Sequence, residues 1–223
     1  MTATARYELA KRIVDVTVAA GVLVAGVPLA AYAAWRIKRE DGGPLLYRGE
    51  RIGVGGRPFA MLKFRSMVVD ATALGGDSTA DDDPRVTATG RMLRRWKLDE
   101  LPQFVNVLAG EMSLVGPRPQ VASDVRRYTQ AERRLLSVKP GITDWASIVF
   151  RDEGAILAGH DDPDAAYDEL IRPRKIQLGL AYVESRSLRT DLHILWLTGC
   201  AVLGVPGIDA RLRHALPADL ANA

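Results

Sequence analysis

The sequence has only one cysteine, Cys200, so no intrachain disulfide can form. The neighbours of Cys200 are apolar, which indicates a small buried hydrophobic residue rather than a reactive thiol. The histidines His160, His193 and His214 fall in no metal-ligand spacing, and no Cys-x-x-Cys or His-Glu-x-x-His pair occurs. A disulfide framework and a zinc site are therefore not expected, and a reducing compartment fits the cysteine content.

The sequence also lacks a strong excess of one charge. It has 30 Lys and Arg residues against 27 Asp and Glu residues, a formal net charge of +3. Basic residues gather beside apolar segments and proline-rich turns, at Lys11, Arg12, Arg36, Lys38, Arg39, Arg91, Arg94, Arg95, Arg118, Arg172, Arg174 and Lys175. This distribution suits anionic lipid head groups or phosphorylated small molecules, so no nucleic-acid partner is expected. At 223 residues the chain can form one compact domain with an appendage.

One segment has no charge at all. Residues 16–35 would cover roughly 30 Å of hydrocarbon as a helix. A cleaved signal peptide could use an Ala-x-Ala site such as Ala31-Tyr32-Ala33, but nothing downstream looks secreted. A simple spanning helix is weakened by Pro28, because proline removes a backbone donor and clashes with the preceding turn.

The residues that flank this segment favour a third interpretation. Basic side chains stand on both sides, at Arg6, Lys11 and Arg12 before it and Arg36, Lys38 and Arg39 after it. A spanning helix should be poorer in Lys and Arg at one end. We therefore favour a re-entrant helix, broken at Gly26-Val27-Pro28, that dips into the membrane and returns to the cytoplasmic side. A buried hairpin of a soluble protein is the plain alternative.

The rest of the chain predicts a mostly helical domain with one small hairpin. Residues 45–52 and 59–64 predict two short strands, and residues 74–83 a polar loop. Helical periodicity covers 92–96, 101–108, 124–138 and 167–188, with Pro173 near the start or at a kink of the last. Residues 192–205 are apolar but too short to span a membrane, which suits an interfacial or core helix. No internal repeat or second domain boundary is evident.

The acidic pair Asp99-Glu100 is the candidate catalytic dyad. Three cations precede it, Arg94, Arg95 and Lys97, and Pro102 is acceptable within a first helical turn. A helix N-terminus stabilises carboxylates and phosphates, so an aspartate there could stay ionised and act as a nucleophile. The second carboxylate could ligate Mg²⁺, which prefers oxygen ligands. Simple helix capping is the alternative role for the pair.

Further cations could bind the phosphates of a substrate. The candidates are Lys63, Arg65, Arg94, Arg118 and Arg151. The planar guanidinium of arginine can donate two parallel hydrogen bonds to phosphate oxygens, and the lysine ammonium acts as a point charge. This set of residues therefore suits a diphosphate. Taken singly, each of these residues could equally form a surface ion pair. The sequence cannot tell whether they converge in space.

Six strings occur in an order that resembles a known family. They are Lys11-Arg12-Ile13-Val14-Asp15, Lys63-Phe64-Arg65-Ser66-Met67, Asp83-Pro84-Arg85-Val86-Thr87, Leu98-Asp99-Glu100-Leu101-Pro102-Gln103, Ser113-Leu114-Val115-Gly116-Pro117-Arg118-Pro119 and Lys139-Pro140-Gly141-Ile142-Thr143. Together they resemble the bacterial sugar transferase family, the monotopic polyprenyl-phosphate phosphoglycosyl transferases. The resemblance runs from about Lys11 to Val205.

The resemblance implies an activity. Family members transfer sugar 1-phosphate from a UDP-sugar to undecaprenyl phosphate, release UMP and so initiate glycan synthesis. It implies Asp99 as the nucleophile that forms a phosphosugar-aspartyl intermediate, and Glu100 as a residue for Mg²⁺ or positioning. It also assigns phosphate contacts to Lys63, Arg118 and Arg151. The alternatives are a catalytically silent membrane scaffold and a hydrolase of phosphorylated lipids.

The predicted architecture follows from both arguments. We expect an α/β fold, mostly helical with a small β-hairpin, in a small monotopic protein with interfacial amphipathic helices. Residues 1–40 would form the membrane helix with its basic flanks, 41–210 a catalytic domain on the cytoplasmic face of the bacterial inner membrane, and 211–223 a flexible tail. A homo-oligomer is compatible with the sequence.

Two departures from the family pattern limit the prediction. Val27 replaces the usual Ser before Pro28, which removes a hydroxyl that could accompany the helix break, and Asp144 replaces a frequent Gly. We therefore do not predict the donor sugar of this chain from the donor sugars of better-known members.

Overall fold

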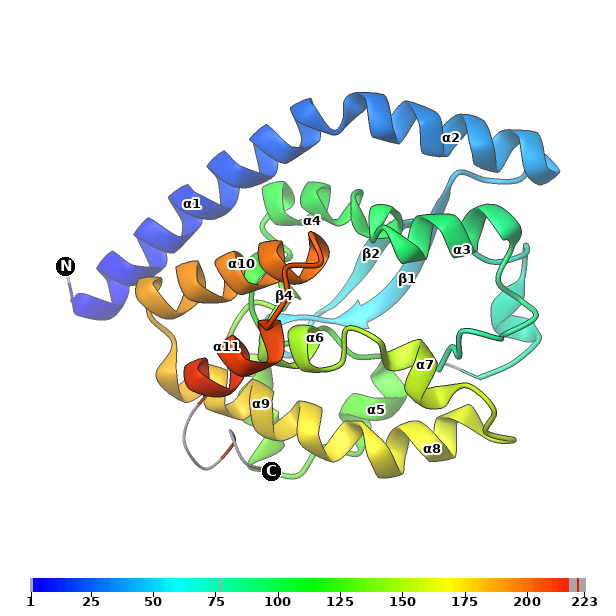
Figure 1. The fold of residues 1–223 in the computed structure, drawn as a ribbon. Coiled ribbons are helices and arrows are strands. Elements are labelled where there is room, and N and C mark those ends of the chain that lie inside the picture. Colours follow the sequence, from blue (N-terminus) through cyan, green and yellow to red (C-terminus); the bar gives the residue numbers. More distant parts are fainter. Residues whose placement is uncertain (1, 77, 217–219, 221–223) are drawn as a thin grey trace.

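The computed structural model describes residues 2–76, 78–216 and 220. Most of them are helical, as predicted (Figure 1). The helices are α1 (Ala3–Ala25), α2 (Val27–Asp41), α3 (Ala88–Arg95), α4 (Gln103–Ala109), α5 (Ala122–Arg126), α6 (Trp145–Val149), α7 (Glu153–Leu157), α8 (Pro163–Leu170), α9 (Arg172–Ser185), α10 (Leu188–Val202) and α11 (Ile208–Ala215). The strands are β1 (Leu46–Ile52), β2 (Pro58–Phe64), β3 (Ser113–Val115) and β4 (Gly141–Thr143), and the 3-10 turns are η1 (Val54–Gly56), η2 (Ala71–Ala73), η3 (Leu98–Glu100) and η4 (Glu132–Ser137).

Helices α1 and α2 form a bent pair. Their axes differ by 58° at Gly26, and Pro28 stands in the first turn of α2, where its missing N–H costs no helical hydrogen bond. The predicted break is confirmed. The absence of a serine hydroxyl does not prevent it, because the Gly26 N–H donates to Val22 O (2.7 Å) and Gly26 O accepts from the Ala30 N–H (2.8 Å).

Both arms of this bent pair are attached to the same body. In α1, Lys11 Nζ donates to Asp191 of α10 at 2.9 Å. At the end of α2, Asp41 forms an ion pair with Arg65, directly after β2. Figure 1 shows the pair running along one edge of the molecule, with α3 and α4 beneath it. Within the described residues no single helix is long and apolar enough to cross a membrane, although the bent pair together meets those criteria.

The predicted hairpin is confirmed. Strands β1 and β2 pair antiparallel from Leu46 opposite Phe64 to Ile52 opposite Pro58. Gly55 and Gly56 in the connecting turn have φ of 68° and 79°, a region that glycine enters without a steric penalty. The hairpin directs Lys63 of β2 toward the turn between α3 and α4, where its ammonium meets Glu100.

A second sheet was not predicted. Strands β3 and β4 pair in parallel, with Ser113 opposite Gly141 and Val115 opposite Thr143. A Cβ on Gly116 would lie 2.4 Å from the Lys139 backbone oxygen, and one on Gly141 would lie 2.1 Å from the Gly116 nitrogen. Both glycines are therefore needed for close backbone approach. Strands of three residues carry too little periodicity to be detected in the sequence.

Two predicted helices are each divided in the structure. Residues 124–138 form α5 and, after a break, η4, because Thr129 and Glu132 build a reciprocal cap: the Thr129 N–H donates to Glu132 Oε2 (2.7 Å) and the Glu132 N–H donates to Thr129 Oγ1 (3.3 Å). Residues 167–188 form the end of α8 and then α9, which meet at Ile171. Pro173 stands in the first turn of α9, so it starts a helix rather than kinking one.

The C-terminal helices cover the main core. In α10, Ile194 and Leu197 are fully buried while Trp196 is half exposed, so one face of this helix belongs to the core, in line with the predicted interfacial or core helix. Residues 211–215, which the sequence placed in a flexible tail, instead continue helix α11, because Leu212 is buried against the core. The remainder of the predicted tail, except residues 216 and 220, lies outside the described residues.

A smaller apolar cluster lies under α2. It contains Ala33 and Ile37 of α2, Phe64 of β2 and Leu93 of α3, with Leu101 packed against it. This cluster fixes α3 and the turn after it against α2, and that turn carries the acidic pair.

Candidate active site

The acidic pair lies on the turn between α3 and α4. Lys97 adopts a left-handed conformation (φ 54°, ψ 20°), which reverses the chain before η3 and brings Asp99 to the interior with 5% exposure. Helix α4 begins at Gln103, with Pro102 as its N-cap rather than in its first turn. The dyad therefore lies just before the N-terminus of α4, beside a helix start as predicted.

Glu100 is held by two cations from different elements. Its Oε1 accepts from Lys63 Nζ at 3.0 Å and from Arg118 Nη2 at 2.6 Å. Lys63 comes from β2, and Arg118 follows β3 between two prolines. Burial alone would raise the pKa of Glu100, but the charges of Arg118 and Lys63 outweigh it and hold that pKa well below its usual range. Glu100 is therefore an ionised, immobilised carboxylate.

Asp99 has a different environment from its neighbour. Its Oδ2 lies 4.0 Å from Lys63 Nζ, and its Oδ1 is buried without a hydrogen-bond partner. Burial raises the pKa of Asp99, and Glu100 adds to this, whereas Lys63, Arg94 and Lys97 oppose it. Burial is therefore the largest influence on this pKa, and the nearby cations favour the ionised form. That a helix N-terminus keeps Asp99 ionised stays a prediction.

Arg94 lies beside the dyad, and Arg65 lies apart from it. Arg94 Nε donates to Ser66 Oγ at 2.9 Å, and its charge acts on Asp99. Arg65 donates to both carboxylate oxygens of Asp41 and, through Nε, to Pro44 O at 2.7 Å. These bonds tie α2 to the end of β2, and the phosphate-binding role given to Arg65 stays a prediction.

Arg151 lies on the connection between α6 and α7. Its guanidinium pairs with Asp209 (2.9 Å) and with Asp152 (3.5 Å). Its backbone oxygen accepts from Lys97 Nζ at 3.3 Å, which brings this connection next to the dyad turn. The backbone of Arg151 is thus near the candidate site, while its side chain is occupied with acidic partners.

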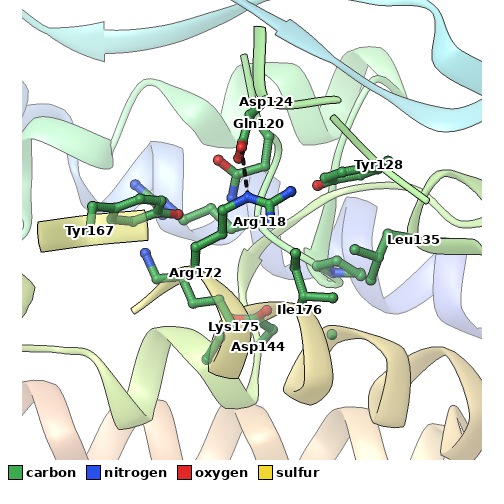
Figure 2. A pocket seen from close by; sticks show the side chains of 13 residues that line it. Arg118, Gln120, Asp124, Tyr128, Leu135, Asp144, Tyr167, Arg172, Lys175 and Ile176 are labelled. Atoms are coloured by element: carbon green, nitrogen blue, oxygen red, sulfur yellow. Dashed lines mark hydrogen bonds and ion pairs between the residues drawn. The ribbon is translucent and has the colours of Figure 1, made fainter. Parts of the chain in front are cut away.

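A pocket opens on the other side of Arg118. Figure 2 shows the side chains that surround it, which come from the loop after β3, from α5 and the residues that follow it, from η4, from the start of α6, and from α8 and α9. The lining includes Asp144 and Lys175, neither of which the sequence analysis placed in the site. Lys175 pairs with Glu153 and lies 5.0 Å from the centre of the Tyr167 ring. The charged groups of this pocket largely neutralise one another, so it is a polar pocket rather than a strongly basic one.

Sequence reasoning missed several residues that the tertiary structure brings to the site. Ser66 orients Arg94, and Gln103 is fully buried directly after the dyad. Both belong to the six family-like strings, and that membership was the one signal that could have identified them. Asp144 was noticed only as a departure from the family pattern, and it lines the pocket beside Arg118.

The donor set can be compared with what Mg²⁺ requires. Within the described part of the chain, no group of three or more His, Cys, Asp or Glu residues could hold a metal ion. Asp99 and Glu100 offer two adjacent carboxylates, and Oδ1 of Asp99 is a buried oxygen with no hydrogen-bond partner. Mg²⁺ is commonly bound by one or two carboxylates together with substrate phosphates and water. Asp99 and Glu100 therefore fit a Mg²⁺ site that substrate phosphates and water would complete, and do not fit a site built from protein ligands alone.

The comparison with known proteins identifies the family of this chain. A family model described as bacterial sugar transferase matches residues 6–205, which include the dyad, the cations that hold it and the pocket. The chain belongs to the bacterial sugar transferase family. The predicted membership is confirmed.

Three relatives show what this sugar transferase resembles. Galactosyl transferase CpsE of Streptococcus agalactiae is 37% identical over 207 residues, which cover 87% of this chain and 42% of CpsE. The uncharacterized sugar transferase EpsL of Bacillus subtilis is 35% identical, with 89% and 90% covered. The UDP-glucose:undecaprenyl-phosphate glucose-1-phosphate transferase of Escherichia coli is 37% identical, with 85% and 39% covered. The chain thus spans about two fifths of two of these relatives and most of EpsL.

Proposed function

We propose that this sugar transferase moves a sugar 1-phosphate from a UDP-sugar to polyprenyl phosphate, with release of UMP and with Asp99 as the nucleophile. The observation that carries the proposal is the unequal environment of the two carboxylates: Lys63 and Arg118 hold Glu100 by hydrogen bonds of 3.0 and 2.6 Å, whereas Oδ2 of the buried Asp99 lies 4.0 Å from Lys63. The names of several relatives state undecaprenyl phosphate as their acceptor, which supports this reaction class.

In the first step a carboxylate oxygen of Asp99 attacks the phosphorus that bears the sugar. A bond forms between that oxygen and phosphorus, the phosphoanhydride bond breaks, and UMP leaves with the bonding electron pair. Lys63 and Arg118 lie within hydrogen-bond distance of Glu100, so their remaining N–H groups can stabilise charge that develops on the phosphate oxygens.

In the second step a phosphate oxygen of the polyprenyl phosphate attacks the same phosphorus. The bond to Asp99 breaks, the carboxylate is restored, and the product is a polyprenyl diphosphate sugar. Splitting the transfer in this way lets one site serve two substrates in turn. Glu100 stays ionised throughout because its cations favour the charged form.

Asp99 and Glu100 are the residues that would hold Mg²⁺. When bound there, the ion would neutralise part of the charge on the diphosphate. The chain's own contribution is the placement of the two carboxylates and of the cations beside them.

The membrane proposal is a re-entrant helix at the cytoplasmic face of the bacterial inner membrane. It is supported by the attachment of both arms of the α1–α2 pair to the catalytic body, through Lys11 and through Asp41. It is also supported by exposed apolar side chains near the break, such as Val24 and Val27, at 76% and 61% exposure. Such a helix would hold the dyad at head-group depth, where a long-chain lipid presents its phosphate.

The test is UMP release from a panel of UDP-sugars, with Mg²⁺ and polyprenyl phosphate. The wild-type protein should release UMP from at least one donor, and Asp99→Asn should reduce release to background because an amide is a poor nucleophile. Asp168→Asn, which changes an exposed carboxylate that pairs with Arg127, is the matched control and should behave as wild type. Full turnover by Asp99→Asn would refute the covalent scheme.

The same assay separates the alternatives. A lipid-phosphate hydrolase would release product from one substrate without an acceptor or donor partner. A silent scaffold would release no UMP from any donor. Radiolabel from a donor carrying a labelled β-phosphate should remain on the wild-type protein when the acceptor is omitted.

A further inference from the structure

Unpaired buried polar atoms concentrate on the turn that carries the dyad. Among the described residues, five buried side-chain nitrogen or oxygen atoms have no hydrogen-bond partner. Three of them belong to two residues, Oδ1 of Asp99 and both amide atoms of Gln103. A buried polar group without a partner costs about 1–3 kcal/mol, so this clustering within a short segment requires a reason.

The packing of α4 does not by itself leave amides unpaired. Asn106 lies one turn after Gln103 and is also buried, yet its side chain is fully engaged. It accepts from the Leu62 N–H at 3.0 Å and donates to Ala60 O at 2.8 Å and to Glu111 at 2.7 Å. The open hydrogen-bonding capacity of Gln103 is therefore a local property of the residues next to the dyad.

The spacing of Gln103 and Asp99 allows them to interact. Right-handed turns continue from η3 into α4, with the Leu101 N–H bonded to Leu98 O and the Val105 N–H to Pro102 O. These bonds join residues three apart, so Gln103 lies just over one turn after Asp99. Glutamine and aspartate side chains about one turn apart on a helical stretch can form hydrogen bonds.

We propose that Gln103 is a positioning residue for the nucleophile: its side-chain N–H donates to Oδ1 of Asp99 and directs Oδ2 toward the reacting phosphorus. Oδ2 is the oxygen on the Lys63 side, 4.0 Å from its ammonium. A carboxylate oxygen has two lone pairs, so this bond leaves the dyad able to ligate a cation. The catalytic part of this inference rests on the function proposed above.

The first test is Gln103→Leu, which keeps a similar volume and removes both polar atoms. We expect kcat for UMP release to fall about 10-fold, the value of one hydrogen bond to a charged group, with KM for the donor unchanged. The thermal midpoint should fall only modestly, because Oδ1 of Asp99 loses its donor, and the variant should remain folded at the assay temperature. Gln177→Leu, at an exposed glutamine of α9, should change neither quantity.

The second test does not depend on turnover. The measurement is a ¹H–¹⁵N correlation NMR spectrum of protein with ¹⁵N-labelled glutamine. The side-chain amide resonance of Gln103 is assigned by its loss in Gln103→Leu. Asp99→Asn should shift this resonance, and Asp168→Asn should not.

Each outcome decides the proposal. Wild-type kcat in Gln103→Leu, a fall in its thermal midpoint that accounts for the lost activity, or a Gln103 resonance insensitive to Asp99→Asn would overturn it. If the wild-type protein releases no UMP while the resonance still shifts, the proposed function fails and the Gln103–Asp99 contact stands.

Discussion

At the scale of single residues, the site depends on which carboxylate is held and which is not. Arg118 and Lys63 share one oxygen of Glu100, and their charges lower its pKa while burial raises that of Asp99. Two adjacent residues of similar chemistry thus acquire different roles from their surroundings. The order of residues in the chain is not enough to distinguish them.

Arg118→Ala should impair catalysis more than folding. The change removes the guanidinium that donates to Glu100 at 2.6 Å and leaves Lys63 as the cation that still donates to Glu100. We expect kcat/KM for UMP release to fall about 100-fold, as for loss of one charge-stabilising donor in other enzymes. Arg127→Ala, which breaks an exposed ion pair with Asp168, is the control and should keep wild-type kinetics. Equal kinetics in both variants would contradict a role for Arg118 in the site.

At the scale of elements, the break between α1 and α2 touches the dyad turn. A Cβ on Gly26 would lie 2.8 Å from Val22 O and 3.1 Å from Cδ2 of Leu101, the residue after Glu100. The glycine is therefore required by close packing, because its own φ of −80° suits any residue. The break between α1 and α2 and the turn that carries the acidic pair are in direct contact.

Gly26→Ala should consequently destabilise the protein by about 1–3 kcal/mol through overpacking, and should also lower UMP release by displacing the dyad turn. Gly21→Ala is a well-matched control, since a Cβ at this position in α1 meets nothing within 4 Å. Alanine there should stabilise the helix slightly. Thermal unfolding in detergent and the UMP assay measure the two effects, and unchanged values for Gly26→Ala would refute the contact.

The end of α2 should show a pH-dependent attachment. The hydrogen bonds from Arg65 lower the pKa of Asp41 from 3.8 to about 2. Because the folded value lies below the unfolded one, the stabilisation is complete above pH 3.8 and is lost as pH falls toward about 2. Asp41→Asn should therefore lower the thermal midpoint at neutral pH, and its difference from wild type should shrink below pH 4. A difference that is constant with pH would contradict this assignment.

At the scale of the whole molecule, α1 is part of the catalytic body rather than a detached anchor. Lys11 is one of the cations that the sequence matched to lipid head groups or phosphorylated small molecules. It is only 13% exposed and donates to Asp191, Val115 O and Tyr182. Arg12 donates to the backbone oxygens of Val107 and Leu108. Lys11 and Arg12 of the basic flank thus face the protein, whereas Arg6 is exposed.

Lys11→Met should therefore be strongly destabilising. It leaves Asp191 buried without its cation, and breaking such a pair typically costs about 3–5 kcal/mol. Arg186→Met removes an exposed ion pair that also reaches α1, through Glu8, and should cost about 1 kcal/mol or less. Denaturant unfolding in detergent should separate the two variants, and similar losses would argue against a buried anchor.

The topology of the bent pair can be read by labelling. In a Cys200→Ala background, Arg6→Cys and Arg39→Cys place single thiols on exposed positions of either arm. The re-entrant arrangement predicts that a membrane-impermeant reagent reaches both from the cytoplasmic side. Labelling from opposite sides would establish a spanning helix.

The sequence alone determined the features that rest on local chemistry. Pro28 after Gly26 determines the helix break, the glycines at 55 and 56 determine the hairpin turn, and short motifs reveal the dyad and the family. These are set by backbone sterics and by strings of adjacent residues, which need no knowledge of distant partners. The capping pair Thr129 and Glu132 was equally local and could have been detected.

The tertiary structure decided everything that depends on convergence. Lys63 and Arg118 are 55 positions apart, as their numbers in the chain show, and meet at one oxygen of Glu100 because β2 and the loop after β3 both bring a cation to the turn that carries it. Arg65, from the same string as Lys63, instead bonds to Asp41. Charge interactions and burial act through space, so the sequence could name the candidates but only the fold could separate the cations of the site from those that hold helices together.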